Sequence, residues 1–214
     1  ERNWQEIKLN QNIVKKTQQL NNFSYIVSRL IVSRKFDQEE IYTIRNYLEL
    51  PNKFSNNLDF INSSKLIENA INNKEKICIL GDYDVDGSAA TALLIKFFEK
   101  IKQPYLYYIP DRVKDGYGPS KKLFQKLIQE KIELVIMVDC GSTANEAVDF
   151  LNINKIKSLI IAHHEINEPY PKSNEIINPK KDNGYIEYDY LCATTLTYFF
   201  LEILAKKINC KINL

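Results

Sequence analysis

The stretch that decides the fold is residues 77–87, which read ICILGDYDVDG. Its first four residues are apolar, as in a strand that is buried on both faces, and they are followed by a glycine and three alternating acids. Residues 88–94 read SAATALL and have a helical pattern. A buried strand that passes directly into a helix is the repeating unit of a parallel sheet covered by helices.

The same alternation continues towards the C-terminus. Further strands are expected at Tyr105–Ile109, Leu134–Val138, Leu159–Ile161 and Glu175–Ile177. Helices are expected at Ala89–Lys100, Lys121–Glu130, Asn145–Leu151 and Cys192–Ile208. We therefore predict an α/β fold, in which a parallel β-sheet is flanked by helices and ligands bind at the carboxyl ends of the strands.

The residues before this pattern predict a separate helical region. Apolar positions repeat at helical spacing around Tyr25–Ile31 and Gln38–Leu48, and this region shows no chemistry. We expect an N-terminal helical lead-in over residues 1–74 and an α/β domain over residues 75–214. Because the chain begins with Glu1 and stops directly after a helical pattern, we expect a fragment whose second domain is truncated at its C-terminal end.

Composition excludes several classes of protein. With 44% hydrophobic residues, the 214-residue chain can bury a sizeable core, and its net charge of +2 means that any polyanion site must be local. The four cysteines form no CxxC pair, which argues against a zinc ribbon or a disulfide framework. The apolar runs are far shorter than the roughly 20 residues of a membrane span. A cytoplasmic protein without membrane contact is expected.

Three carboxylates follow the first strand in one short extended turn. Asp82, Asp84 and Asp86 would repel one another unless a divalent cation lay among them. A calcium-binding EF-hand would need further oxygen ligands and a glutamate at loop position 12, whereas here a helix follows. The alternative is an ordinary turn in which the three carboxylates are solvated and bind no metal.

Two later strands end in residues of the same kind. Asp139 follows the strand Leu134–Val138, although an acid there often only caps the next helix. The only two histidines, His163 and His164, follow Leu159–Ile161. Each is weak alone, but together they place carboxylates and imidazoles at one edge of the sheet, a set that suits Mn²⁺. Two such ions bridged by a carboxylate would activate water and clamp a phosphate.

The loop after the strand Tyr105–Ile109 returns to the same edge. Within it, Arg112 could grip phosphate oxygens, and Tyr117, between two glycines, could expose its ring to a base or sugar. The alternative is a structural loop in which Ser120 caps the following helix.

These motifs, in this order and spacing, resemble those of the DHH phosphoesterases. The extended forms GDYDVDG, IPDRVKDGYG and VDCG are similar to those of the bacterial RecJ exonucleases, and the resemblance covers nearly the whole chain. It implies two Mn²⁺ or Mg²⁺ ions and 5′ to 3′ hydrolysis of single-stranded DNA in recombination and repair. It also implies single-strand-binding proteins or helicases as partners.

The resemblance assigns a role to each candidate residue. Asp84 and Asp86 would be metal ligands, Asp82 a ligand or a close support, and Asp139 the bridge between both ions. His163 would bind one ion, His164 would orient the site or contact the phosphate, and Arg112 would contact the DNA backbone. Asp82, Asp84, Asp86, Asp139, His163 and His164 together form the expected catalytic set.

The chain departs from the family pattern in two ways. Ala162 stands where the signature aspartate is expected, and such a loss beside a metal site typically weakens affinity or activity by about 10-fold to 100-fold. The family also supplies another metal-binding aspartate beyond the helix that ends near Ile208. Asp189 does not lie at that place, and the family's C-terminal domains are missing. We expect these 214 residues alone to be inactive or nearly so.

Alternative functions remain open. One is a small DHH phosphodiesterase for oligoribonucleotides or cyclic dinucleotides, and a more distant one is a pyrophosphatase. A different class is a non-catalytic DHH-like nucleic-acid-binding scaffold without metal, which Ala162 favours and the retained acids and histidines oppose.

Overall fold

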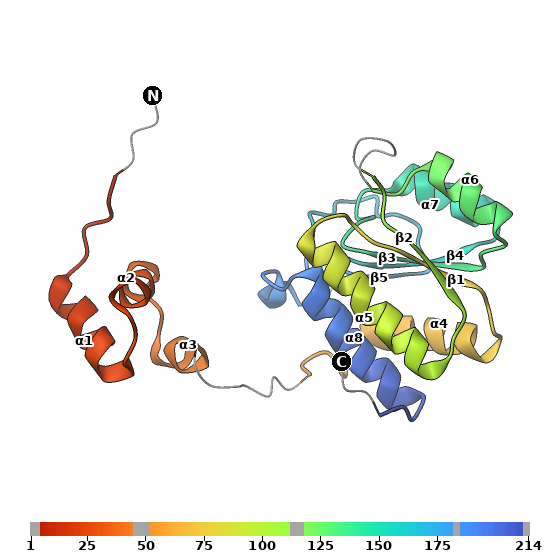
Figure 1. Ribbon diagram of the computed structural model, residues 1–214. Helices are drawn as coiled ribbons and strands as arrows, with labels where there is room; N and C mark the ends of the chain where they lie inside the picture. Colours follow the sequence, from red (N-terminus) through yellow and green to blue (C-terminus); the bar gives the residue numbers. More distant parts are fainter. Residues whose placement is uncertain (1–4, 45–51, 112–117, 182–184, 212–214) are drawn as a thin grey trace. The chain divides into compact units, whose positions relative to one another are not determined.

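The computed structural model of the chain describes residues 5–44, 52–111, 118–181 and 185–211 (Figure 1). The chain forms two compact units, Glu1–Pro51 and Asn52–Leu214. Across these described ranges, no helix combines the length and the apolar character that crossing a membrane requires.

The first unit is helical. It contains α1 (Gln11–Asn21), α2 (Tyr25–Arg34) and α3 (Gln38–Thr43). Each helix begins after a side chain that accepts a hydrogen bond from its first turn, and these N-caps are Asn10, Ser24 and Asp37. Its small buried core consists of Phe23, Ile31 and Ile41. The helices expected near residues 25–31 and from residue 38 are present, and residues 45–48 lie outside the described part.

The second unit contains a five-stranded, fully parallel sheet in the order β2-β1-β3-β4-β5. Its strands are β1 (Ile77–Leu80), β2 (Tyr105–Tyr108), β3 (Leu134–Val138), β4 (Lys157–Ile161) and β5 (Glu175–Ile177). Its α-helices are α4 (Leu58–Asn72), α5 (Val85–Ile101), α6 (Lys121–Gln129), α7 (Asn145–Ile153) and α8 (Ala193–Lys207), and a short 3-10 helix, η1, spans Ile186–Tyr188.

Helices cover both faces of the sheet. Figure 1 shows α4, α5 and α8 on one side and α6 and α7 on the other. Alternate residues of β1 enter the two cores: Ile77 and Ile79 pack in the first, while Cys78 and Leu80 pack in the second, and all four are 0% exposed. Burial on both faces explains why β1 and β3 are unbroken apolar runs. The predicted α/β class is confirmed.

The helix after β1 begins earlier than expected. It starts at Val85 rather than Ala89, because the Asp84 side chain caps it by accepting a hydrogen bond from the Gly87 N–H at 2.9 Å. Asp86 therefore lies in the first turn of α5 and not in an extended turn with its neighbours. This start directs Asp86 towards a different partner, as described below.

The sequence led us to expect a domain boundary near residues 72–75. The boundary between the two compact units lies upstream of that position, between Pro51 and Asn52. Helix α4 contacts α8 and β5, and its Phe60 and Ile67 are 0% exposed in the core of the second unit. Because α4 buries its apolar side against the sheet layer, the second unit begins at Asn52.

Candidate metal centre

The candidate residues gather at the carboxyl edge of three adjacent strands. Asp82 and Asp84 follow β1, Asp139 follows β3, and His163 and His164 follow β4. Strand β3 lies between β1 and β4 in the sheet, so Asp139 stands between the other acids and the histidines. This is the edge at which open parallel sheets bind ligands.

Asp139 is the central residue of this group. Its side chain is 1% exposed, and neither carboxylate oxygen has a hydrogen-bond partner among the described residues. Its φ of +58° is a left-handed conformation that aspartate tolerates better than most residues, and Gly141 continues the turn at φ +96°. Helix α7 has Ala144 as its N-cap, so Asp139 is not its cap. A buried carboxylate without hydrogen-bond partners is costly unless a cation compensates it.

Asp82 and Asp84 complete an acidic group around Asp139. One ligand atom from each of these three carboxylates lies within 4.8 Å of the others. The Asp82 carboxylate accepts a hydrogen bond from the Tyr83 N–H at 2.7 Å, and Asp84 caps α5. Gly87 lets the helix approach, since a Cβ there would lie 2.6 Å from the Asp82 Cβ. Local backbone geometry thus holds both acids in place.

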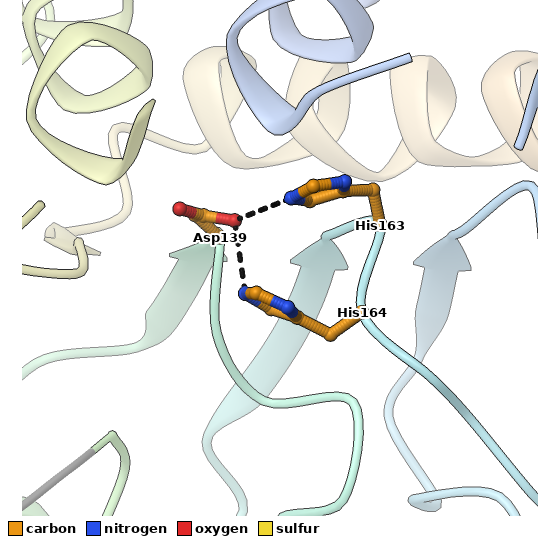
Figure 2. Close-up of side chains that lie close together, drawn as sticks. All are labelled: Asp139, His163 and His164. Atoms are coloured by element: carbon orange, nitrogen blue, oxygen red, sulfur yellow. Dashed lines mark ion pairs between the residues drawn. The ribbon is translucent and has the colours of Figure 1, made fainter. Parts of the chain in front are cut away.

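The two histidines approach the other side of Asp139. Figure 2 shows both imidazoles directed at the same oxygen, with His163 Nε2 at 3.4 Å and His164 Nε2 at 3.2 Å from Asp139 Oδ1. Within the described part of the chain, His164 Nε2 has no hydrogen-bond partner in suitable geometry. Together with Asp139, the two histidines form a second group whose ligand atoms lie within 4.8 Å of one another.

The charges at this edge favour a cation. Burial, together with the negative charges of Asp86 and Asp84, raises the pKa of Asp139 to about 8. Burial and the neighbouring His164 lower the pKa of His163, which favours its neutral form. A neutral imidazole is the form that ligates metals, and a positive ion would stabilise the ionised Asp139.

Asp86 has a different environment from the other acids. Its two oxygens accept hydrogen bonds from the backbone N–H groups of Ala193 at 2.7 Å and Thr194 at 2.8 Å, at the start of α8. Burial raises its pKa, but the hydrogen bonds from Thr194 and Ala193 outweigh burial, and the net pKa is lowered. Asp86 also lies 3.5 Å from His163 Nε2. It belongs to neither ligand group, and its expected ligand role remains a prediction.

The two groups fit divalent cations. They share Asp139, and their carboxylate and imidazole donors are the hard and intermediate ligands that suit Mn²⁺ or Mg²⁺. Such an ion would satisfy the Asp139 oxygens, which accept no hydrogen bond from the described residues.

Of the other residues expected to matter, some are described by the structure and some are not. Arg112 and Tyr117 lie outside the described residues, so their expected contacts with substrate remain predictions. The Ser120 hydroxyl accepts a hydrogen bond from the Leu123 N–H and caps α6. Ala162 is 0% exposed and packs in the apolar core beneath α6 and α7, together with Cys140.

Two residues with contacts at this edge were not singled out from the sequence. Thr194 joins Asp86 to α8, and Asn178 donates a side-chain hydrogen bond to the backbone carbonyl of His164 at 2.9 Å. A signal for Asn178 was present, because it directly follows the strand expected at residues 175–177. Nothing in the sequence marks Thr194, whose partner is 108 residues away.

Comparison with known proteins identifies the family. The model of the "DHH family, N-terminal domain" matches residues 76–213. The single-stranded-DNA-specific exonuclease RecJ of Bacillus subtilis is 29% identical over 83% of this chain and 23% of its own length. That of Haemophilus influenzae is 32% identical over 66% of this chain and 25% of its own length. The chain thus spans about a quarter of the length of these relatives.

A solved structure shows the same fold. The crystal structure of exonuclease RecJ bound to manganese superposes with a TM-score of 0.67 at 23% identity, and the match covers 78% of this chain and 41% of that chain. The family match extends over more than half of the chain and includes every residue of both candidate ligand groups. The chain belongs to the DHH family.

Proposed function

We propose that this chain is the metal-binding part of an exonuclease that hydrolyses phosphodiester bonds in single-stranded DNA with two divalent cations, Mn²⁺ or Mg²⁺. The observation that carries the proposal is Asp139, a buried carboxylate without hydrogen-bond partners that faces two acids on one side and two imidazoles on the other. The RecJ relatives, which are named for their action on single-stranded DNA, supply the substrate class.

The residues divide the work by position. Asp82 and Asp84 would hold one cation, His163 the other, and Asp139 both. When bound, such cations lend Lewis acidity to phosphoryl oxygens and lower the pKa of water. His164, with 42% of its side chain exposed, would contact a phosphate oxygen of the substrate or orient the site. Asp86 holds the start of α8 against α5 and lies 3.5 Å from His163 Nε2.

The surroundings of the site restrict where a DNA strand can lie. A hollow of about 480 Å³ is lined by Glu165, the residue that follows His164 in the chain, and by Glu168 and Asp189. Its Lys180 is paired with Glu165 at 2.7 Å. This acidic lining disfavours phosphates, so the backbone of the strand is not expected to lie in this hollow.

Ala162 should weaken the enzyme. An aspartate at this buried position would add negative charge near the cations, as the family signature does. We expect Ala162→Asp to lower the stability of the metal-free protein, because the carboxylate would be buried among apolar side chains. Mn²⁺ should restore that stability, and activity should rise by about 10-fold to 100-fold.

The test is Mn²⁺-dependent digestion of single-stranded DNA labelled at either end, at one salt concentration because phosphate contacts depend on salt. The polypeptide would be compared with Ala162→Asp, Asp139→Asn and Asp149→Asn, the last being a charge-matched control at an exposed position of α7. We expect at most a weak loss of label from the 5′ end of the DNA, which Ala162→Asp increases, which Asp139→Asn abolishes and which Asp149→Asn leaves unchanged.

Two other outcomes would replace the proposal. If Mn²⁺ does not bind and DNA binds equally well without it, the chain is a metal-free DHH-like scaffold, the function that Ala162 favours. If oligoribonucleotides or cyclic dinucleotides are hydrolysed in preference to DNA, the alternative phosphodiesterase function holds instead.

A further inference from the structure

We propose that Asn178 is a positioning residue for the metal centre, which fixes His164 and links it to helix α4. The inference rests on the proposed function, because it assigns Asn178 a part in building that same site. It goes beyond the family match, since α4 precedes the matched residues 76–213.

Asn178 uses its whole side chain at this point. It is 0% exposed, and its amide nitrogen donates hydrogen bonds to the His164 carbonyl at 2.9 Å and to the Ser142 hydroxyl at 3.2 Å. Its amide oxygen accepts a hydrogen bond from the Lys180 N–H at 2.9 Å. An asparagine supplies two donors and an acceptor in one plane, so no apolar residue can replace these contacts.

Two of these contacts, to Ser142 and His164, join the ends of three neighbouring strands. Ser142 lies in the turn after Asp139 and β3, His164 follows β4, and Asn178 directly follows β5. Loops after strands are otherwise free to move relative to one another. The amide therefore sets the distance between the turn that carries Asp139 and the loop that carries His164.

A second set of contacts holds Asn178 itself. Its backbone N–H donates to the Tyr185 hydroxyl at 3.0 Å, and this hydroxyl donates to Asp59 at 3.3 Å. Asp59 lies on α4 and pairs with Lys181 at 3.0 Å. Tyr185 is 3% exposed, so water does not compete for its hydroxyl. The chain of contacts runs from α4 through Tyr185 and Asn178 to His164.

A buried asparagine could also stabilise the fold without orienting the histidine. The two roles predict changes in different measured properties. A purely stabilising residue would lower the melting temperature and leave the imidazole unchanged in the protein that remains folded. A positioning residue would change the surroundings of His164 at temperatures where the protein is fully folded. The chain contains only two histidines, so their NMR signals can be followed individually.

The experiment compares Asn178→Ala with Ser158→Ala. Ser158 is also 0% exposed and hydrogen-bonded, to Ser173 at 2.9 Å, but it lies in the second position of β4, at the end of that strand away from the histidines. Imidazole ¹⁵N spectra of the metal-free proteins, Mn²⁺ titrations and melting curves would be recorded for the whole chain.

We expect Asn178→Ala to shift or broaden the His164 signals and to weaken Mn²⁺ binding about 10-fold or more, while Ser158→Ala changes only the melting temperature. Unchanged His164 signals in Asn178→Ala, equal shifts in both variants, or shifted signals with unchanged Mn²⁺ affinity would each overturn the inference. If Asn178→Ala does not fold, Tyr185→Phe and Ser142→Ala carry the same comparison.

The two proposals fail separately. If the unmutated chain binds no Mn²⁺, the proposed function falls, and the imidazole spectra alone still decide whether Asn178 positions His164. If Mn²⁺ binds but Asn178→Ala leaves the spectra and the affinity unchanged, the proposed function stands and the role of Asn178 is refuted.

Discussion

The two sides of Asp139 are built in different ways. On the acidic side, Asp82 and Asp84 are held by backbone N–H groups one and three residues away, within a single strand-to-helix turn. On the imidazole side, His164 is held by Asn178, and the last link of that network, from Tyr185 to Asp59, joins residues 126 apart. The acidic side is therefore a property of a short sequence, while the imidazole side depends on the completed fold.

Removing the residue shared by both sides should have the largest effect. Asp139→Asn should abolish detectable Mn²⁺ binding, because each ligand group loses its central carboxylate. Isothermal titration with Asp149→Asn as the control measures this. Retention of both binding sites in Asp139→Asn would show that the two sides act independently.

The same substitution should change how stability depends on pH. The folded pKa of about 8 lies above the ordinary value of about 3.9, so the stability that protonated Asp139 contributes is present below about pH 4 and is lost as the pH rises to about 8. Without metal at pH 8, Asp139→Asn should be about 1–3 kcal/mol more stable than the original chain. Urea unfolding in EDTA at pH 5 and pH 8 checks this, and equal pH dependence would contradict it.

Gly87→Ala should disturb only the side of the metal centre formed by Asp82 and Asp84. The new Cβ would meet the Asp82 backbone at 2.7 Å, and we expect a loss of about 2–4 kcal/mol in the free energy of unfolding. Gly118→Ala is the control, because at φ +70° it is strained but meets nothing within 4 Å, and it should cost about 1 kcal/mol. Equal losses in the two variants would mean that close packing against Asp82 does not matter.

Asp86→Ala should show whether Asp86 acts as the cap of α8 or as a metal ligand. Losing both backbone hydrogen bonds at the start of α8 should cost about 1–3 kcal/mol of stability, while Mn²⁺ affinity changes less than in Asp84→Ala. Urea unfolding and Mn²⁺ titration would be run on both variants. An affinity loss as large as that of Asp84→Ala would make Asp86 a ligand, as the sequence led us to expect.

The smallest effect is expected at the far end of the imidazole side. Asp59→Asn should weaken Mn²⁺ binding by about 2-fold to 5-fold, because it loosens Tyr185 and hence Asn178. Glu165→Gln removes a carboxylate with 79% of its side chain exposed and should leave the affinity unchanged. Mn²⁺ titration of both variants measures this. Equal Mn²⁺ affinities would mean that the network that supports His164 extends only to Asn178 and Ser142.

Sequence patterns predicted the sheet well because burial on both faces leaves unbroken apolar runs. Strands β1, β3 and β5 have the expected bounds, and the positions of Asp82, Asp84, Asp139, His163 and His164 follow from where strands end. The start of α5 was placed late, because a helix cap at Asp84 and a possible metal turn use the same residue types.

The contacts made across the fold could not be predicted. Asp86 resembles its neighbours in sequence, and only the packing of α8 on α5 shows that its oxygens cap another helix. In the same way, nothing near Asn178 reveals that its partners are the Ser142 and His164 loops. Such pairings depend on tertiary packing and leave no local periodicity.

The cap that Asp86 places on α8 also bears on the order of folding during synthesis. Its partners lie 107 and 108 residues further along the chain, so the start of α8 cannot be secured until nearly the whole domain has left the ribosome. Strands β1 and β2 and helix α5 can associate much sooner, since they are close in sequence. The residues of both candidate ligand groups precede α8, so they are expected to come together before this cap forms, and the cap is the later contact.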